Sequence, residues 1–202
     1  MSQGGKHRPF RLPLIDIATR QPSTGAEYGA VILGGTALYG PDQDQLNEAV
    51  ERIQNAIEGT LTNHLLMARN HLEKLVRQSL GENVNDRVLG AVLGRSLRLG
   101  AVCVLPCLTV NGRVMRMYFH KNNRLMVKTK LASLGSCLSG KTAMSVDNAQ
   151  FECFPQREWG TRFVVKQLLA HLAYEGRAVF LDEDLFGSPL SSIEHALSTR
   201  RK

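Results

Sequence analysis

The sequence predicts an α+β fold, in which a three-stranded (or larger) antiparallel meander packs with one long helix and two or three shorter helices. Apolar residues recur in steps of three and four from Leu46 to Leu75, as they do on one face of a helix. A nearly continuous apolar run, 101–110, leads into Asn111-Gly112, the residue pair most typical of a tight β-hairpin turn. Shorter helical patterns lie elsewhere in the chain, so strands and helices do not alternate as they do in a parallel α/β protein.

Size and composition favour one domain preceded by an arm. Residues 1–25 are rich in Gly, Pro, Ser and basic side chains, and predict a partly ordered basic arm. Residues 26–202 would form a single α+β domain, because a chain of 202 residues suits one sizeable core better than two. There is no apolar run of the roughly 20 residues that a membrane span needs, and no secretory signal pattern. We therefore expect a soluble protein of the cytoplasm or of a nuclear-type compartment. No internal repeat is evident.

The first part of this domain is predicted to hold a strand and two helices. Residues 27–39 are apolar with three glycines, and predict a buried strand that bends or turns near Gly34-Gly35. A long helix is expected at about 42–80, with Gly59 and Thr60 as the place where it kinks or divides. Its sustained apolar seam is typical of helices that pair with their own copy, so self-association is predicted through it. A shorter helix is expected at 85–99.

The second part is predicted to begin with a basic β-meander at about 101–131. Its strands would be 101–110, 113–120 and 125–131, and Pro106 indicates that the first of them is an edge strand or carries a bulge. Beyond it the sequence predicts a strand at 150–154, a helix at 161–174 and a strand at 178–181. Ser188-Pro189 then opens a last helix, so that 161–202 forms a C-terminal helical part.

The positive charge is concentrated in one window. The formal net charge is +7, and residues 81–141 hold ten Lys or Arg against two acids. Between Asp86 and Asp147 there is no Asp or Glu at all. Unrelieved like charge weakens a folded surface, so such a window is typical of proteins that bind a polyanion. The sequence leaves one alternative open, which is that acids of the 42–80 helix cover the window in three dimensions.

Side-chain alternation predicts that the meander has an apolar and a basic face. Met115, Met117 and Phe119 would face the core, and the residues between them would face outward. Cations beside an exposed aromatic ring suit nucleic acid, since cations follow phosphates and bases stack on the ring. The alternative is a solvated face whose lysines prevent edge aggregation. The predicted nucleic-acid-binding residues are Arg113, Arg116, Tyr118, His120, Lys121, Arg124, Lys128, Lys130 and Lys141.

Residues 135–142 match the phosphate-binding pattern G-x-x-x-x-G-K-[ST]. In such a loop backbone amides cradle phosphates, the lysine reaches the β and γ groups, and the hydroxyl and a distant acid hold Mg²⁺. Lysines at 128 and 130 argue against this site, because a strand entering such a loop is nearly all apolar. Mg-NTP would be the cofactor only of a true P-loop, and otherwise no cofactor is expected. The nucleotide-binding residues would be Gly135, Gly140, Lys141, Thr142 and Asp182.

Taken together, these patterns favour a non-enzymatic, oligomeric nucleic-acid-binding protein, with DNA and RNA both open. One alternative is a self-assembling, matrix-like structural protein that binds an anionic membrane surface. Another is an NTP-binding protein that uses 135–142. No catalytic or metal site is predicted, because the histidines and the four cysteines lack the spacings of a zinc site or of a nucleophile with its base.

Overall fold

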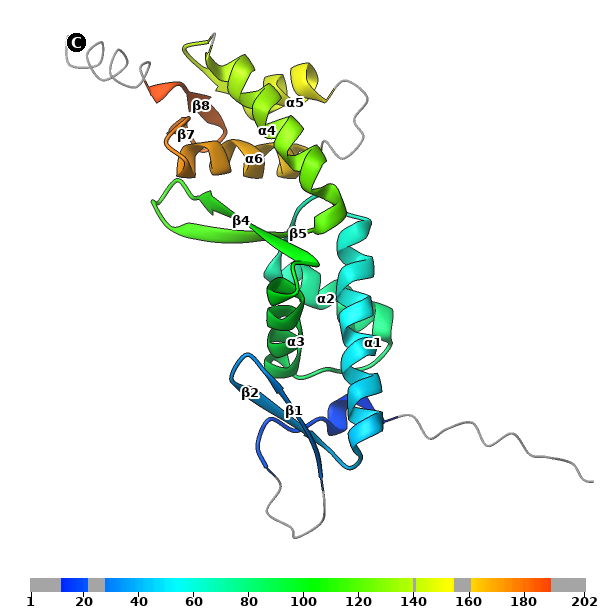
Figure 1. Cartoon of the computed structure of the whole chain (residues 1–202). Coiled ribbons are helices and arrows are strands. Elements are labelled where there is room, and N and C mark those ends of the chain that lie inside the picture. The colour runs from blue at the N-terminus through cyan, green and yellow to red at the C-terminus, as the bar shows by residue number, and fades with distance from the viewer. Residues whose placement is uncertain (1–11, 22–27, 140, 155–160, 190–202) are drawn as a thin grey trace, which may run out of the picture. The chain divides into compact units, whose positions relative to one another are not determined.

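The computed structural model describes residues 12–21, 28–139, 141–154 and 161–189. These residues form six α-helices and three small antiparallel sheets, which confirms the α+β class (Figure 1). They divide into two compact units: unit 1 holds the described residues of 1–57 and 73–99, and unit 2 those of 58–72 and 100–202. No helix in the described part of the chain is long and apolar enough to cross a membrane. Most of the predicted arm, and nearly all of the predicted last helix, lie outside the described residues.

In unit 1 the glycine-rich segment folds back on itself as a hairpin of β1 (Gly29–Leu33) and β2 (Thr36–Gly40). The turn lies at the predicted place, because Gly34 and Gly35 adopt φ of 55° and 83°, a region that residues with a Cβ rarely enter. Arg98 ends the helix α3 (Asp86–Arg98), and its Nη1 lies 2.1 Å from where a Cβ of Gly34 would stand. The tip of the hairpin is thus covered by the end of α3.

The prediction of one long helix at 42–80 is wrong. The chain forms α1 (Gln43–Thr62), the two-residue strand β3 (Met67–Ala68) and α2 (Arg69–Leu80). Where α1 ends, a side chain supplies hydrogen bonds that a further helical turn would have made. Asn123 Nδ2 donates to the carbonyl oxygens of Leu61 and His64 at 3.3 and 3.2 Å. The apolar residues after the break are as buried as those of α1 before it. Apolar spacing alone therefore does not reveal where the helix ends.

α2 and α3 are joined by a short turn that both helices hold. Asn85 caps α3, because its Oδ1 accepts from the backbone N–H of Arg87 at 2.8 Å. From α2, the Arg77 guanidinium donates to the Val84 carbonyl at 3.1 Å and pairs with Asp86. α3 confirms the shorter helix predicted at 85–99.

The main sheet of unit 2 has the antiparallel strand order β3-β5-β4. β4 (Val102–Leu108) and β5 (Val114–His120) form the predicted hairpin, and β4 is an edge strand, as Pro106 predicts. The predicted third strand at 125–131 is wrong, because these residues belong to α4 (Arg124–Ser139) and the third strand is β3. The buried residues of α4 are spaced by four, three and four positions, which is the helical period: Val127, Leu131, Leu134 and Leu138.

The rest of unit 2 consists of two more helices and a second small sheet with the strand order β6-β8-β7. The elements are β6 (Met144–Ser145), α5 (Val146–Cys153), α6 (Arg162–Tyr174), β7 (Val179–Asp182) and β8 (Leu185–Gly187). α6 and β7 confirm the predicted helix and strand at 161–174 and 178–181. The strand predicted at 150–154 is wrong, because the chain is helical as far as Cys153.

α6 lies at the centre of unit 2 and packs against β4, α4 and α5 (Figure 1). Nine of its thirteen residues are buried. Two hydrogen bonds tie it to β4: Cys107 Sγ donates to the Gln167 carbonyl at 3.2 Å, and His171 Nδ1 donates to the Pro106 carbonyl at 2.6 Å. Because a carbonyl only accepts, Nδ1 is the donor in this contact.

The same order of elements occurs twice in the chain. Residues 43–120 (repeat 1) and 124–187 (repeat 2) each run through a helix, a two-residue strand, two helices and a hairpin. In both repeats the two-residue strand pairs with the second strand of the hairpin, and a methionine faces an aromatic residue there: Met67 faces Tyr118, and Met144 faces Phe186. The repeat is not evident in the sequence because the order of elements recurs and the residues do not.

Candidate nucleic-acid interface

The β4–β5 hairpin presents an arginine at a tightly held turn. Asn111-Gly112 predicts a two-residue loop, but the loop has three residues, with Thr109 N donating to the Arg113 carbonyl at 2.8 Å. Gly112 adopts a φ of 73°, the left-handed conformation that such a loop needs at its last position. Thr109 Oγ1 also accepts from Arg113 N and donates to Arg113 O, both at 3.0 Å. The backbone of Arg113 is therefore fixed while its side chain is exposed.

Along β5 the predicted alternation holds for the core face and only in part for the other. Met117 and Phe119 are buried in the core of unit 2, and Arg116 is exposed on the opposite face. Tyr118 and His120 share that face, yet each is only 6 % exposed. The prediction of an exposed ring on which a base could stack is therefore wrong at Tyr118. His120 has a structural contact instead, because its Nδ1 accepts from Asn122 N at 3.3 Å.

Three further cations follow β5 at the start of α4. Lys121 lies in a short 3-10 turn, Lys121–Asn123, and Arg124 and Lys128 lie in the first helical turns. Their spacing of three and four residues places them along one side of the chain there, and all three are exposed. Asn123, which holds the end of α1, anchors the turn that carries Lys121. A helix thus brings together residues that were predicted to lie on a third strand and its loop.

The surface cations of unit 2 fall into two classes. From 141 to 177, every described lysine and arginine contacts a carboxylate: Lys141 pairs with Glu152, Arg162 with Asp147 and Asp184, Lys166 with Glu183 and Asp184, and Arg177 with Glu175. Five exposed cations in 113–128 have no carboxylate partner among the described residues. We call these five the basic surface: Arg113, Arg116, Lys121, Arg124 and Lys128.

Lys130 and Lys141, which were also predicted to contact nucleic acid, are engaged within unit 2. The ammonium of Lys130 donates to the Cys153 carbonyl at 2.9 Å and lies 4.5 Å from the centre of the Phe154 ring. Lys141 forms its ion pair with Glu152. The ammonium of Lys130 is held by a carbonyl and a ring, and that of Lys141 by a carboxylate, so neither belongs to the basic surface.

The loop predicted at 135–142 is wrong for its first half. Residues 135–139 form the last turns of α4, so their amides donate within the helix and do not point to a common centre. Gly135 gives room to the guanidinium of Arg177, whose Nη2 lies 2.5 Å from where a Cβ would stand. Thr142 is exposed, Asp182 Oδ1 accepts from the neighbouring Glu183 N at 2.7 Å, and Gly140 lies outside the described residues. Nucleotide binding here stays a prediction, and the helical amides argue against it.

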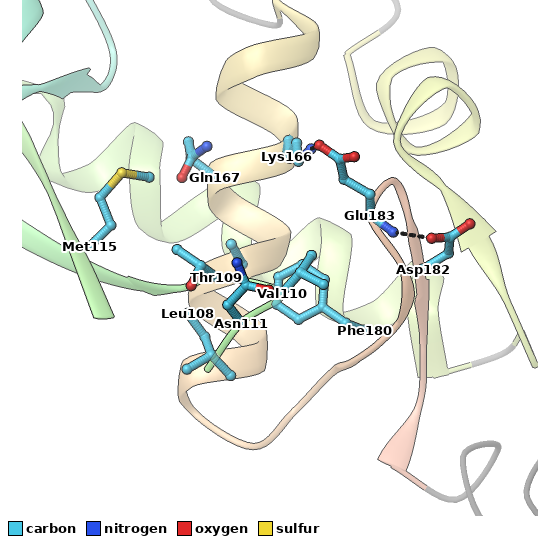
Figure 2. A pocket seen from close by; sticks show the side chains of 11 residues that line it. Leu108, Thr109, Val110, Asn111, Met115, Lys166, Gln167, Phe180, Asp182 and Glu183 are labelled. Carbon is cyan, nitrogen blue, oxygen red and sulfur yellow. Dashed lines mark hydrogen bonds and ion pairs between the residues drawn. The ribbon is translucent and has the colours of Figure 1, made fainter. Parts of the chain in front are cut away.

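A groove of about 550 Å³ lies between the hairpin tip, α6 and β7 (Figure 2). Gln167 projects into it from α6, and its buried Oε1 has no hydrogen-bond donor among the described residues. Asp182 and Glu183 lie on the rim, where Glu183 pairs with Lys166. The two carboxylates outnumber the single ammonium, so this groove repels phosphate and is not part of the interface.

The division of cations into paired and unpaired classes was not accessible from the sequence, because the carboxylate partners lie 2 to 22 residues away along the chain. The signal that could have found α4 is the helical spacing of its buried residues, which continues past the predicted strand. No family model, no curated protein and no solved structure matches this chain.

Proposed function

We propose that the chain binds duplex DNA through the basic surface. The observation that carries the proposal is that its five exposed cations lack a carboxylate partner in the described structure, whereas the described lysines and arginines of 141–177 are all paired. Neighbouring cations repel one another, and phosphates relieve this repulsion while they release condensed counterions. A polyanion is therefore the partner that such a surface favours.

The spacing of the basic surface suits an extended partner. Arg113 and Lys121 lie at opposite ends of β5, which at about 3.4 Å per residue is a separation of roughly 25 Å. Duplex DNA carries one charge per about 1.7 Å of its axis, so it offers phosphates along the whole of that length. A free nucleotide would reach only one end.

The order of elements in repeat 1 supports DNA in particular. α2 and α3, with the turn between them, form a helix-turn-helix, and the second helix of such a motif enters the major groove with its N-terminal residues towards the bases. Arg87, the second residue of α3, is exposed. A β-hairpin after the second helix is the added element of winged helix-turn-helix domains. This is an analogy of topology, and it supports DNA binding only in combination with the unpaired cations.

The proposal is tested by titrating the protein into a labelled duplex of about 30 base pairs and following fluorescence anisotropy. The double variant Arg124→Gln, Lys128→Gln should bind on the order of tenfold more weakly or worse, because two phosphate contacts are lost. A matched double variant, Arg20→Gln with Lys141→Gln, removes the same charge outside the basic surface. It should stay within about twofold of the wild type. Circular dichroism of each variant would establish that it is folded.

Three outcomes would count against the proposal, and a fourth would favour the nucleotide site. Equal losses in the two double variants would mean that net charge alone causes binding. Tighter binding to single strands or to structured RNA would replace duplex DNA as the ligand. Preference for anionic vesicles over any oligonucleotide would favour the membrane-binding alternative. A saturable ATP interaction that disappears in Lys141→Ala would instead restore the nucleotide site.

A further inference from the structure

Two of the four cysteines lie in contact, and they come from different helices. Cys137 is in the last turns of α4 and Cys153 is the last residue of α5, and their sulfur atoms are 3.4 Å apart. Both are free thiols. A disulfide needs a sulfur separation of about 2.05 Å, so the two atoms must approach by roughly 1.4 Å. That movement is within the reach of side-chain rotation.

A second contact keeps the two helices together at this point. Lys130, about two turns before Cys137 on α4, donates to the carbonyl oxygen of Cys153 at 2.9 Å. Its ammonium also lies 4.5 Å from the ring centre of Phe154, the residue after Cys153. The backbone of Cys153 is thereby held against α4, and the proximity of the sulfurs does not depend on the thiol contact alone.

We propose that Cys137 and Cys153 form an intrachain disulfide when the protein meets a peroxide, with Cys137 as the thiol that reacts first. Cys137 is partly exposed, whereas Cys153 is only 7 % exposed. The Cys153 thiol donates its hydrogen to Cys137 Sγ, so the accessible sulfur is also the one that accepts. Access is one of the properties that govern the reactivity of a cysteine, and it favours Cys137 here.

The reaction balances with hydrogen peroxide as the oxidant. Cys137 Sγ attacks one peroxide oxygen, the O–O bond breaks, and a sulfenic acid and one water form. Cys153 Sγ then attacks Cys137 Sγ, the S–O bond breaks, and the thiol proton of Cys153 leaves with the hydroxide as a second water. Two thiols and one peroxide give one disulfide and two waters, with two electrons passing from sulfur to oxygen.

The acid–base state of Cys153 is consistent with its role as the second, resolving thiol. Burial, followed by the hydrogen bond to Cys137, raises the pKa of Cys153 to about 12. The group is therefore protonated in the resting protein and does not compete for peroxide. The other buried thiol, Cys107, is also protonated, because burial raises its pKa to about 12, and its hydrogen goes to the Gln167 carbonyl and not to another sulfur.

Tryptic cleavage separates the two pairs of cysteines, which makes the proposal directly testable. Cys137 lies in peptide 131–141, Cys153 in peptide 142–157, and Cys103 and Cys107 share peptide 99–113. Native protein treated with a small excess of hydrogen peroxide would be alkylated in denaturant, digested without reductant and analysed by mass spectrometry. We expect peptides 131–141 and 142–157 joined, with the loss of two hydrogens, and peptide 99–113 alkylated at both cysteines. Electrophoresis without reductant should show a monomer.

Variants establish the order of the steps. In Cys153→Ser the sulfenic acid at Cys137 has no resolving thiol, so dimedone should label peptide 131–141. In Cys137→Ser peroxide should leave Cys153 as a free thiol that is alkylated only in denaturant. Cys103→Ser is the matched control and should form the cross-link as the wild type does. Separate recovery of the two peptides after peroxide, a cross-linked dimer, or a disulfide within 99–113 would each overturn the proposal.

Discussion

Two lysines that are two positions apart in α4 have opposite roles. Lys128 is exposed and has no carboxylate partner in the described residues, while Lys130 is bonded to the Cys153 carbonyl at 2.9 Å and lies against the Phe154 ring. On a strand the two would share a face, which is how the sequence predicts both for the interface. On a helix two residues are separated by about 200°, so one points to solvent and the other towards α5. Whether a charge is available for a ligand depends here on the local backbone.

This difference predicts that one lysine affects stability and the other affects DNA binding. Lys130→Ala should lower the free energy of unfolding by about 1–2 kcal/mol, since a hydrogen bond and a cation–π contact are lost, and should leave DNA affinity within about twofold. Lys128→Ala should change stability by less than about 0.5 kcal/mol and should weaken DNA binding several-fold. Urea titrations and anisotropy on the same two preparations measure both effects. If the two variants behave alike, the assignment of Lys130 to the interior is wrong.

Asp184 makes the stability of unit 2 dependent on pH. Ion pairs with Lys166 and Arg162, at 2.9 and 2.6 Å, hold the pKa of Asp184 below its ordinary value of 3.8. A depressed folded pKa contributes stability that is present above the unfolded pKa and is lost as the pH falls through the folded pKa. The wild type should therefore be more stable than Asp184→Asn at neutral pH, and the difference should decrease as the pH falls below about 4. Urea titrations at neutral and acidic pH check it, and a difference that does not decrease as the pH falls would contradict the ion pairs.

At the scale of elements, what could be predicted was decided by local signals. The β1–β2 turn, the β4–β5 hairpin, α3 and α6 carry glycine turns or a capping residue, and each was found close to its predicted place. The prediction of a strand in place of α4 was wrong because Leu125 and Val127 alternate as in a strand, although Leu125 is 76 % exposed. The place of the break between α1 and α2 was not predicted, because the residue that holds it, Asn123, lies about 60 residues further along the chain. Long-range partners of this kind leave no trace in apolar spacing.

The helical state of 135–139 gives an element-scale prediction. Gly135→Ala should raise the free energy of unfolding by up to about 1 kcal/mol, because Gly costs that much more than Ala inside a helix. The added Cβ meets only the end of the flexible Arg177 side chain, which is able to move. Gly59→Ala in α1, where nothing lies within 4 Å of the new Cβ, is the matched control and should give the full gain. A clear loss of stability in Gly135→Ala alone would indicate that this segment is a phosphate loop after all.

At the scale of the whole chain, the two repeats share an order of elements but differ in charge. The hairpin of repeat 1 carries the unpaired Arg113 and Arg116, whereas the turn between β7 and β8 in repeat 2 carries Glu183 and Asp184, both ion-paired. The second helix of a helix-turn-helix pair is α6 in repeat 2, and most of it is buried in the core. If the proposed function is correct, repeat 1 would contact DNA and repeat 2 would support it. Self-association through the 42–80 segment stays a prediction, and the seam that predicts it is buried within the chain.

The number of unpaired cations predicts how strongly salt weakens DNA binding. Each phosphate contact contributes about −0.9 to the slope of log K against log salt, so five contacts give a slope of about −4 to −5. Lys128→Gln should reduce the magnitude of that slope by about 1 and weaken binding to all duplex sequences alike. Anisotropy titrations from about 50 to about 200 mM salt measure both. A slope near zero would mean that the basic surface does not meet phosphates.

The contact between His171 and Pro106 has a consequence for aggregation. β4 is the open edge of its sheet, and exposed edges invite pairing with a strand of another molecule. The register places Pro106 opposite Arg116 in a pair that exchanges no hydrogen bonds, so its nitrogen and carbonyl both face away from β5. The proline nitrogen has no hydrogen to donate, and the carbonyl already accepts from His171 Nδ1 at 2.6 Å. An incoming strand would find neither a donor nor a free acceptor at Pro106, and this protects the edge of β4 from pairing.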